Sequence, residues 1–520
     1  MALHFADLFE HAADAVPDRV AVVCEDRQVN FRELDERSTR LAHHLASLGT
    51  GPGDHVGLYA RNSIEAVETL VAAVKLRAAA VNINYRFVEG ELRYMFADAD
   101  LAALVHDAVL TEVVDAARDA APTLRGTVVI GGDYEALLAK ESAERDFGER
   151  SPDDVYIIYT GGTTGHPKGV MWRHEDIWRT LGGGIDFVTG ERLPDEWAQS
   201  SQAADGGLVQ LVAAPLIHGN AQVATMMSLF MGHTVVLLPR FDPEKIWLAI
   251  GEHQVNVLVL IGDAMARPLI ETYRQGSFDT SSLFAVSSSA ALFSPVVKEA
   301  WATAVPDAVI TEAIGSTETG FAGLGFVTAG EAAYTAVTVN PGPDVLVLDD
   351  AGVPCGPGQT GWLARGGHVP LGYYKDPDKT AKLFAEVDGK RYTLPGDMAR
   401  VEEDGSITLL GRGNTCVNTG GEKVYPEEVE GALKSHPDVF DALVIGVPDE
   451  RLGQRVAAVV QPRDGVTVDL ADLDAHVRKQ IAGYKVPRTV WLADAIQRTA
   501  SGKANYGWAK DYASTHEAAS

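Results

Sequence analysis

The chain has 520 residues, 46% of them hydrophobic, and a formal net charge of −28 at pH 7. This length predicts two or more domains rather than a single core. The acidity argues against nucleic acid or an anionic membrane as a partner, because both attract clustered lysine and arginine side chains. The three widely spaced cysteines exclude a disulfide framework and a zinc motif. No run of 18 apolar residues occurs and the acidic N-terminus differs from a signal peptide, so we expect a cytoplasmic protein.

The first 140 residues alternate β-branched runs with amphipathic helical patterns. Strands are expected at residues 20–24, 55–59, 79–83 and 101–105. A helix is expected over residues 31–48, because its leucines recur on one face, Asn30 and Glu33 form a capping box before it, and Gly49 follows its last turn. This alternation predicts a layered α/β domain.

Units of the same kind continue over residues 154–330, and a stretch with more strand character, rich in glycine and proline, covers 335–411. The pattern changes after Arg412. A helix is expected to begin at Pro426, followed by strands near 440–447 and 455–461, a helix near 470–482, a strand near 489–493 and a frayed tail from Asp511. The predicted fold class is α/β, with a large multilayered N-terminal domain of mixed sheets and a small α+β C-terminal domain.

The clearest motif is a loop rich in glycine and threonine, Tyr159-Thr-Gly-Gly-Thr-Thr-Gly-His-Pro-Lys-Gly169. An expected strand over residues 154–159 leads into it, so the loop presents successive amides and hydroxyls beyond a strand end, where they can hold a polyphosphate. Lys168 adds a positive charge. The spacing matches neither a Walker A loop nor a dinucleotide-binding fingerprint.

This loop resembles the signature of the adenylate-forming superfamily, which includes acyl-CoA synthetases, adenylation domains of non-ribosomal peptide synthetases and beetle luciferases. Other stretches resemble further motifs of the family, in the family's order: Ala313-Ile-Gly-Ser-Thr-Glu-Thr-Gly320, Gly361-Trp-Leu-Ala-Arg-Gly366, Gly372-Tyr-Tyr-Lys-Asp-Pro377, Pro395-Gly-Asp397, Gly411-Arg412, Gly420-Gly-Glu-Lys423 and Arg498-Thr-Ala-Ser-Gly-Lys503. The stretch Val170-Met-Trp-Arg-His-Glu-Asp176 is similar to a subgroup of actinobacterial enzymes that includes ligases of fatty and sterol-derived acids.

The resemblance implies an AMP-forming acyl-CoA synthetase that uses ATP, Mg²⁺ and coenzyme A. The acid first displaces pyrophosphate from ATP to give an acyl-adenylate, and CoA then takes the acyl group. Lys503 would bridge the carboxylate and the adenylate, Thr317 would bond the α-phosphate, and Glu318 would act at the Mg²⁺ site. His218 would contact the acyl substrate or gate its site.

The nucleotide would be held by residues of the remaining motifs. These are Thr160, Gly161, Gly162, Thr163, Thr164, Gly165 and Lys168 at the departing phosphates; Ser288, Ser289, Ala290, Ala313, Ile314 and Gly315 near the adenine and the acyl carboxylate; and Asp397 and Arg412 at the ribose. An anionic acceptor such as Asp397 makes the stronger, charge-assisted hydrogen bonds to ribose hydroxyls.

The family resemblance also implies a division into domains. Residues 1–411 would bind AMP and the acyl group, residues 412–414 would form a hinge, and residues 415–520 would form a small mobile domain that carries Lys503 and rotates between the two reactions. Gly420, Gly421 and Lys423 would line the path of the CoA arm.

Three positions depart from the family pattern. Ile314 replaces an aromatic residue that stacks on adenine, so apolar packing is expected there instead. Asn414 stands at the hinge position, where Asp or Lys is usual, and Asn418 replaces a common lysine. These changes argue against a luciferase. Many small residues near 182–184, 221–227 and 287–292 favour a bulky or long acyl group, either a medium- to long-chain fatty acid or a sterol-derived acid.

Other functions stay open at this point. An acyl-AMP ligase that loads a carrier protein and an aryl-CoA ligase share the same motifs. A nucleotide-binding regulatory protein is disfavoured because Lys168, Glu318, Asp397 and Lys503 are all intact. The sequence leaves open the acyl group, the acetylation of Lys503, the effect of the atypical hinge and the oligomeric state, a homodimer among the candidates.

Overall fold

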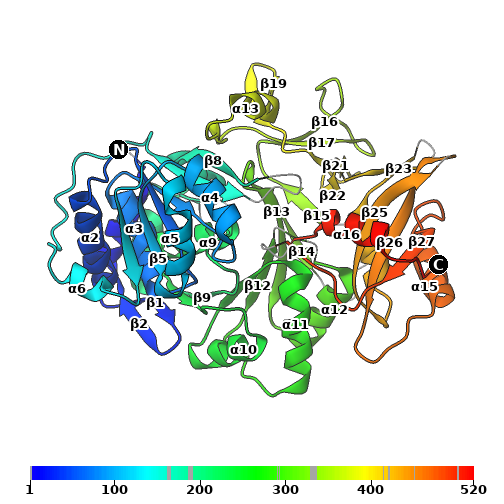
Figure 1. Cartoon of the computed structure of the whole chain (residues 1–520), viewed down its shortest axis with the longest axis horizontal. Coiled ribbons are helices and arrows are strands. Elements are labelled where there is room, and N and C mark those ends of the chain that lie inside the picture. The colour runs from blue at the N-terminus through cyan, green and yellow to red at the C-terminus, as the bar shows by residue number, and fades with distance from the viewer. Residues whose placement is uncertain are drawn as a thin grey trace. The chain divides into compact units, whose positions relative to one another are not determined.

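The computed structural model describes residues 3–160, 166–185, 191–289, 291, 293–327, 337–413, 415–419, 422–449, 451–499 and 503–519. The chain divides into two compact units (Figure 1). Unit 1 comprises Met1–Leu260, Gly276–Val286 and His368–Leu383. Unit 2 comprises Ile261–Gln275, Ser287–Gly367 and Phe384–Ser520.

Unit 1 alternates helices and strands, as its sequence pattern predicts. Its helices are α1 (Phe5–Ala15), α2 (Phe31–Ser47), α3 (Ile64–Lys75), α4 (Glu89–Asp98), α5 (Thr111–Ala117), α6 (Tyr134–Leu138), α7 (His174–Thr180), α8 (Ala198–Gln202), α9 (Gly219–Phe230), α10 (Pro243–Glu252) and α13 (Pro377–Leu383). Its strands are β1 (Val20–Cys24), β2 (Arg27–Asn30), β3 (His55–Tyr59), β4 (Ala79–Asn82), β5 (Leu101–Asp107), β6 (Gly126–Ile130), β7 (Val155–Thr160), β8 (Lys168–Arg173), β9 (Val209–Val212), β10 (Thr234–Leu237), β11 (Val257–Leu260) and β18 (Gly372–Tyr373).

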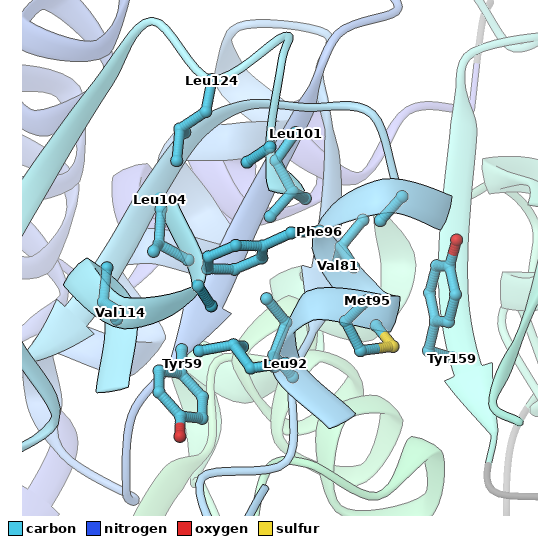
Figure 2. Close-up of a cluster of buried hydrophobic side chains, with 14 of the residues drawn as sticks. Tyr59, Val81, Leu92, Met95, Phe96, Leu101, Leu104, Val114, Leu124 and Tyr159 are labelled. Atoms are coloured by element: carbon cyan, nitrogen blue, oxygen red, sulfur yellow. The ribbon is translucent and has the colours of Figure 1, made fainter. Parts of the chain in front are cut away.

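A four-stranded parallel sheet with the order β4-β3-β5-β6 forms one layer of unit 1. Helix α4 covers it with Leu92, Met95 and Phe96, whose spacing places them on one helical face. Figure 2 shows these side chains gathered in one apolar cluster with Leu101 and Leu104 of β5, and all five are completely buried. This cluster holds the layer together, because each large apolar side chain removed from water stabilises the fold by about 1.5–3 kcal/mol.

The end of β7 is anchored to this layer through Tyr159, which also packs on the cluster (Figure 2). The side chain of Asn82 accepts a hydrogen bond from the Tyr159 backbone N–H at 2.7 Å and donates one to its carbonyl at 2.8 Å. The Tyr159 hydroxyl donates to Asp98 at 2.7 Å. The strand that precedes the glycine-rich loop is therefore fixed in place by its last residues.

A second sheet of unit 1 has the order β11-β9-β10-β1-β2, in which only β2 runs antiparallel to its neighbour. Beside it, the fully buried Lys75 donates to Glu10 at 2.5 Å and to Asp35 at 2.7 Å. Arg150 also pairs with Glu10. A buried ammonium group needs such partners, so these ion pairs join α1, α2 and α3 to the segment around residue 150.

Unit 2 has more strands and fewer helices. Its helices are α11 (Gly262–Gln275), α12 (Pro295–Ala304), α14 (Pro426–Lys434), α15 (Leu470–Arg478) and α16 (Tyr506–Thr515), and strand β12 (Ala285–Ser289) crosses the division along the chain. Its other strands are β13 (Val309–Ser316), β14 (Gly320–Val327), β15 (Thr338–Pro341), β16 (Val345–Leu348), β17 (Thr360–Arg365), β19 (Phe384–Val387), β20 (Lys390–Thr393), β21 (Asp397–Val401), β22 (Ile407–Arg412), β23 (Val417–Thr419), β24 (Glu422–Val424), β25 (Val439–Asp449), β26 (Gly453–Pro462) and β27 (Thr489–Leu492).

Two sheets organise unit 2. In one, β13, β14, β15, β22, β21 and β17 are neighbours in this order and pair antiparallel. In the other, β23, β26 and β25 pair antiparallel and β27 joins β26 in parallel (Figure 1, orange to red). Helices α14 and α15 cover the second sheet through a cluster of buried valines and leucines.

Much of this architecture agrees with the sequence prediction. Strands β1 and β3 have the predicted bounds, and the capping box of α2 is formed by two hydrogen bonds of 2.8 and 2.9 Å between Asn30 and Glu33. The mixed α/β fold class is confirmed. The helix over 470–482 is shorter than predicted and ends at Arg478.

The prediction of a frayed tail from Asp511 is wrong. Helix α16 continues to Thr515, and the ring of Tyr512 stacks on His516 at 3.8 Å. The indole N–H of Trp491 donates to the His516 carbonyl at 3.1 Å. These contacts with β27 hold the end of the chain, a long-range effect that the local sequence does not reveal.

The predicted boundaries at 411 and 415 stay a prediction, because the two units reflect internal packing rather than motion. In the part of the chain that the structure describes, no helix has the length and apolar character needed to cross a bilayer.

Candidate active site

The turn between β13 and β14 places Thr317 and Glu318 at one end of the first sheet of unit 2. Ser316 and Thr319 close this turn: the Ser316 N–H donates to the Thr319 hydroxyl at 2.8 Å, and the Glu318 N–H donates to the Ser316 hydroxyl at 3.2 Å. Glu318 is only 9% exposed. A β-carbon on Gly315 would overlap the Gly320 carbonyl, so the close approach of the two strands requires glycine there.

Asp397 and Arg412 face each other on neighbouring strands. The register of β21 and β22 places them opposite one another, and Arg412 Nε lies 2.9 Å from Asp397 Oδ1. Arg412 also donates to the Pro395 carbonyl at 3.2 Å. The guanidinium keeps about a third of its surface exposed, whereas the carboxylate is mostly buried. The pair therefore joins a partly exposed guanidinium to a mostly buried carboxylate.

Lys503 belongs to the same cluster of charges. Its backbone N–H donates to the Thr499 hydroxyl at 3.0 Å, and its carbonyl accepts from the Thr499 N–H at 2.9 Å, so the loop between them is closed at its ends. Burial lowers the pKa of Lys503 and nearby Arg412 lowers it further, while Glu318 and Asp397 partly offset this. Lys503 is therefore close enough to Arg412, Glu318 and Asp397 to feel their charges.

Asp397 responds to the same neighbours in the opposite sense. Burial raises the pKa of Asp397, Arg412 and Lys503 lower it, and Glu318 raises it. Two carboxylates and two cations close together give a locally neutral group. A ligand that brings both hydroxyls and phosphate charge could be bound there, the hydroxyls by Asp397 and the charge by Lys503 and Arg412.

The donor atoms near Glu318 fit Mg²⁺ that arrives together with a phosphate ligand. Within the described ranges, no group of three or more His, Cys, Asp or Glu side chains is placed to hold a metal ion. Mg²⁺ keeps several waters and is usually held by one or two carboxylates plus substrate phosphates, so a single buried carboxylate suits it.

The predicted phosphate residues Thr160 and Lys168 lie in unit 1. They are register partners at the ends of β7 and β8, so the two strands bring the ends of the glycine-rich loop together. The Lys168 ammonium lies 5.2 Å from the centre of the Tyr373 ring. His166 stacks on Tyr94 at 4.2 Å, and the Tyr94 hydroxyl donates to the Pro167 carbonyl. Both flanks of the loop are thus held.

The other predicted residues occupy different surroundings. His218 precedes α9 and is partly buried. The Ser288 hydroxyl is buried and accepts from the Gly262 N–H at 3.1 Å, and Ser289 ends β12 with part of its surface exposed. Ala313 and Gly315 lie on β13. The Ile314 side chain packs into the apolar core of unit 2 and is 4% exposed, so its predicted contact with adenine stays a prediction.

The chain matches the AMP-binding enzyme family over residues 9–374 and the C-terminal domain of AMP-binding enzymes over residues 428–503. It belongs to the AMP-binding enzyme family. The resemblance on which the sequence analysis depends is thereby confirmed.

Relatives of this AMP-binding enzyme are similar over nearly their whole length. The chain is 52% identical to the 3-oxocholest-4-en-26-oate–CoA ligase of Rhodococcus rhodochrous, covering 98% of this chain and 96% of the relative. It is 51% identical, with the same coverage, to a ligase of Mycolicibacterium smegmatis named for medium/long-chain fatty acids and 3-oxocholest-4-en-26-oate. The predicted likeness to actinobacterial fatty-acid and sterol-acid ligases is therefore confirmed.

Solved structures agree with the fold. The anthranilate CoA ligase AuaEII in complex with anthranoyl-AMP superposes with a TM-score of 0.86 at 23% identity, covering 99% of this chain and 98% of that one. ATP-bound MatB from Rhodopseudomonas palustris superposes with a TM-score of 0.83 at 26% identity, covering 98% and 99%.

Several predicted site residues of this AMP-binding enzyme fall outside the described residues. They are Gly161, Gly162, Thr163, Thr164 and Gly165 of the loop, Ala290, the hinge residue Asn414, Gly420, Gly421 and the side chain of Lys423. Their roles stay predictions.

One residue that contacts the site was not predicted from the sequence. Glu427, in the first turn of α14, lies against Gly411 of β22, where its carboxylate would overlap any β-carbon on that glycine. Burial raises its pKa to about 8, and Glu430 adds to the effect. Pro426-Glu-Glu-Val-Glu was interpreted only as a helix start with acids near the positive end of the helix dipole. The contact forms at Gly411, whose φ of +118° lies in the region that favours glycine.

Proposed function

We propose that the chain is an ATP-dependent acyl-CoA synthetase. It joins a carboxylic acid to AMP with release of pyrophosphate and then transfers the acyl group to CoA, releasing AMP. The observation that carries this proposal is the cluster of Glu318, Asp397, Arg412 and Lys503 in unit 2, formed by four motifs that are far apart in the sequence.

Each residue has a role that follows from its chemistry. Asp397 accepts hydrogen bonds from the ribose hydroxyls, and Arg412 steadies it and reaches the same sugar. Lys503 stabilises the negative charge that gathers where the acid attacks the α-phosphate. No covalent nucleophile of the protein is required, so positioning and charge stabilisation carry the reaction. Glu318 would hold Mg²⁺ together with the phosphates, and the ion would supply further charge neutralisation. By their motif positions, Thr160 and Lys168 bind the departing phosphates.

The substrate that we propose is a medium- to long-chain fatty acid or a sterol-derived acid, as the names of the similar Rhodococcus and Mycolicibacterium ligases suggest. The glycines at 182–184 lend little support on their own. Gly182 and Gly184 have positive φ, and a β-carbon on Gly183 would overlap the Trp178 ring. Local turns and packing therefore account for this run of small residues. We place the reaction in the cytoplasm, where ATP and CoA are available.

Carboxylate-dependent exchange of pyrophosphate into ATP tests the adenylation step. We expect exchange with 3-oxocholest-4-en-26-oate and with fatty acids of ten or more carbons, and little with acetate, benzoate or anthranilate. Asp404→Asn serves as the control for Asp397→Asn, since Asp404 accepts hydrogen bonds from Ser406 at its own turn. The comparison separates loss of the site carboxylate from loss of a negative charge in general. Absence of exchange with every acid would contradict the proposal.

The second half-reaction separates CoA from a carrier protein as acceptor. Consumption of free CoA thiol, together with an acyl-CoA product, is expected once exchange is established. An acyl-adenylate that accumulates in the presence of CoA would favour the carrier-protein alternative instead. Preference for benzoate would favour an aryl-CoA ligase.

A further inference from the structure

Three charged residues recur every fourth position on helix α11. Asp263, Arg267 and Glu271 lie at i, i+4 and i+8, so they occupy one face of the helix Gly262–Gln275. The phosphate and nucleotide motifs do not include them. Because of this spacing, any segment that packs on this face must make a contact with each of the three charged side chains.

The segment that follows residue 425 covers this face with three different elements. Lys434 Nζ, at the end of α14, lies 3.4 Å from Asp263 Oδ2. The Arg267 guanidinium lies 6.0 Å from the centre of the Phe440 ring on β25. Arg463, just after β26, pairs with Glu271 at 2.7 Å. Asp263, Arg267 and Glu271, which we call the charged stripe of α11, therefore each have their own contact with the segment after residue 425.

The contact is charged and buried at one end. Asp263, Arg267 and Lys434 are all less than a tenth exposed. Burial tends to raise the pKa of Asp263, but Lys434 and Arg267 hold it below its usual value. Within the part of the chain described, Asp263 Oδ2 and Arg267 Nη2 are buried without a hydrogen-bond partner.

Such a contact differs from a permanent core. Buried ions without complete hydrogen bonding contribute little net stability, whereas a surface that separates must tolerate water on both sides. At the other end, Glu271 and Arg463 are each about a third exposed, as at the edge of a contact that opens. The chemistry of the face favours reversible docking.

A short chain of contacts connects this face to Lys503. Asp441 follows Phe440 on β25 and accepts hydrogen bonds from the Arg498 guanidinium, from Nη2 at 2.7 Å and from Nε at 3.0 Å. Arg498 lies five residues before Lys503, next to Thr499, which closes the lysine loop. Strand β25 thus contacts Arg267 of α11 through Phe440 and the start of the Lys503 loop through Asp441.

We propose that Asp263, Arg267 and Glu271 form a docking face that holds the segment from α14 to Lys503 in the arrangement that places Lys503 beside Glu318, Asp397 and Arg412. They are positioning residues for adenylate formation, an inference that rests on the proposed function. They touch no reacting atom. Their effect belongs to the step that uses Lys503 and not to thioester formation, which does not need it.

The test reverses the exposed pair, which leaves the buried end intact. Glu271→Arg and Arg463→Glu should each slow pyrophosphate exchange about three- to tenfold through kcat, because a favourable pair becomes a repulsive one. The double variant Glu271→Arg/Arg463→Glu, in which the two charges are swapped, should restore the rate of pyrophosphate exchange to within about twofold of the wild type. Arg478→Glu is the matched control, since its guanidinium pairs with Asp474 of its own helix, and it should leave exchange unchanged. Thioester formation from supplied acyl-adenylate should be unchanged in all four variants.

A second readout needs no substrate. Amide hydrogen–deuterium exchange of the peptides covering 262–275 and 426–434 should be faster in Glu271→Arg than in the wild type. It should return to the wild-type rate in the double variant Glu271→Arg/Arg463→Glu. Unchanged hydrogen–deuterium exchange of both peptides in Glu271→Arg would overturn the docking face. Equal slowing of adenylate formation and of thioester formation would overturn it as well. A wild-type chain without pyrophosphate exchange would overturn the proposed function, and the peptides would still decide the docking face.

Discussion

The carboxylate of Glu427 occupies the space that a β-carbon on Gly411 would need. Gly411 has a φ of +118° and precedes Arg412, so α14 meets strand β22 at a residue that only glycine suits. This contact couples the start of α14 to the position of Arg412, and it leads to two predictions.

Gly411→Ala should destabilise the protein more than Gly405→Ala. Both glycines have positive φ, but a β-carbon on Gly405 would meet nothing within 4 Å. We expect about 1 kcal/mol for the backbone strain in either variant and about 1–3 kcal/mol more for overpacking at residue 411. Urea denaturation measures the difference. Gly411→Ala/Glu427→Ala should remove the extra loss, and persistence of that loss would contradict the contact.

Glu427 should make stability depend on pH. Its pKa is raised to about 8 by burial, with Glu430 adding to the shift, against 4.5 for an ordinary glutamate. Below pH 4.5 the carboxyl is protonated in both states and its contribution is fully present. As pH rises from 4.5 to 8 the unfolded chain releases a proton that the folded one keeps, so stability falls, by about 1.4 kcal/mol for each unit of the shift.

Urea denaturation between pH 5.5 and 8.5 checks this slope. Glu427→Gln should flatten it. Glu428→Gln is the neighbouring control and should keep the wild-type slope. The native Glu428 carboxylate pairs with Lys485 at 2.6 Å. Equal slopes in all three proteins would mean that Glu427 is ionised in the folded state.

Lys503→Ala should slow adenylate formation about a hundredfold or more, because a charge that stabilises the transition state in a partly buried site is lost. Thioester formation from supplied acyl-adenylate should change little. Pyrophosphate exchange and single-turnover thioester formation measure the two steps. Lys510→Ala, an exposed lysine on α16, is the control. Similar slowing of both steps by Lys503→Ala would refute its assignment to the first.

Asp397→Asn should raise the KM for ATP about ten- to a hundredfold, because hydrogen bonds to a charged group contribute about 1.5–3 kcal/mol. The Arg412 guanidinium also loses its carboxylate partner. Initial-rate kinetics with varied ATP measure this, and Asp404→Asn should behave as wild type. An unchanged KM would place the ribose elsewhere.

The sequence predicted features that depend on neighbouring residues or on short motifs. The capping box of Asn30 and Glu33 is local, and the strand leading to Thr160 is announced by its own β-branched residues. Glu318, Asp397, Arg412 and Lys503 were each predicted as site residues because each stands in a family motif. In the structure their charges interact, and their roles stay predictions.

Long-range packing was beyond such signals. Nothing near Glu427 reveals that Gly411 leaves room for it, and the stripe of Asp263, Arg267 and Glu271 has the appearance of an ordinary solvated helix face. Strand β8, which follows the glycine-rich loop, was also not predicted. It is recognised in the structure by its antiparallel pairing with β7, which the local sequence does not reveal.

The most direct test of the whole account is a product analysis by mass spectrometry. The purified chain is incubated with ATP, Mg²⁺, CoA and 3-oxocholest-4-en-26-oate or a long-chain fatty acid. We expect equal amounts of acyl-CoA, AMP and pyrophosphate, and at least about a hundredfold slower formation of all three by Lys503→Ala. Formation of ADP and phosphate, or of no thioester with any acid, would contradict it.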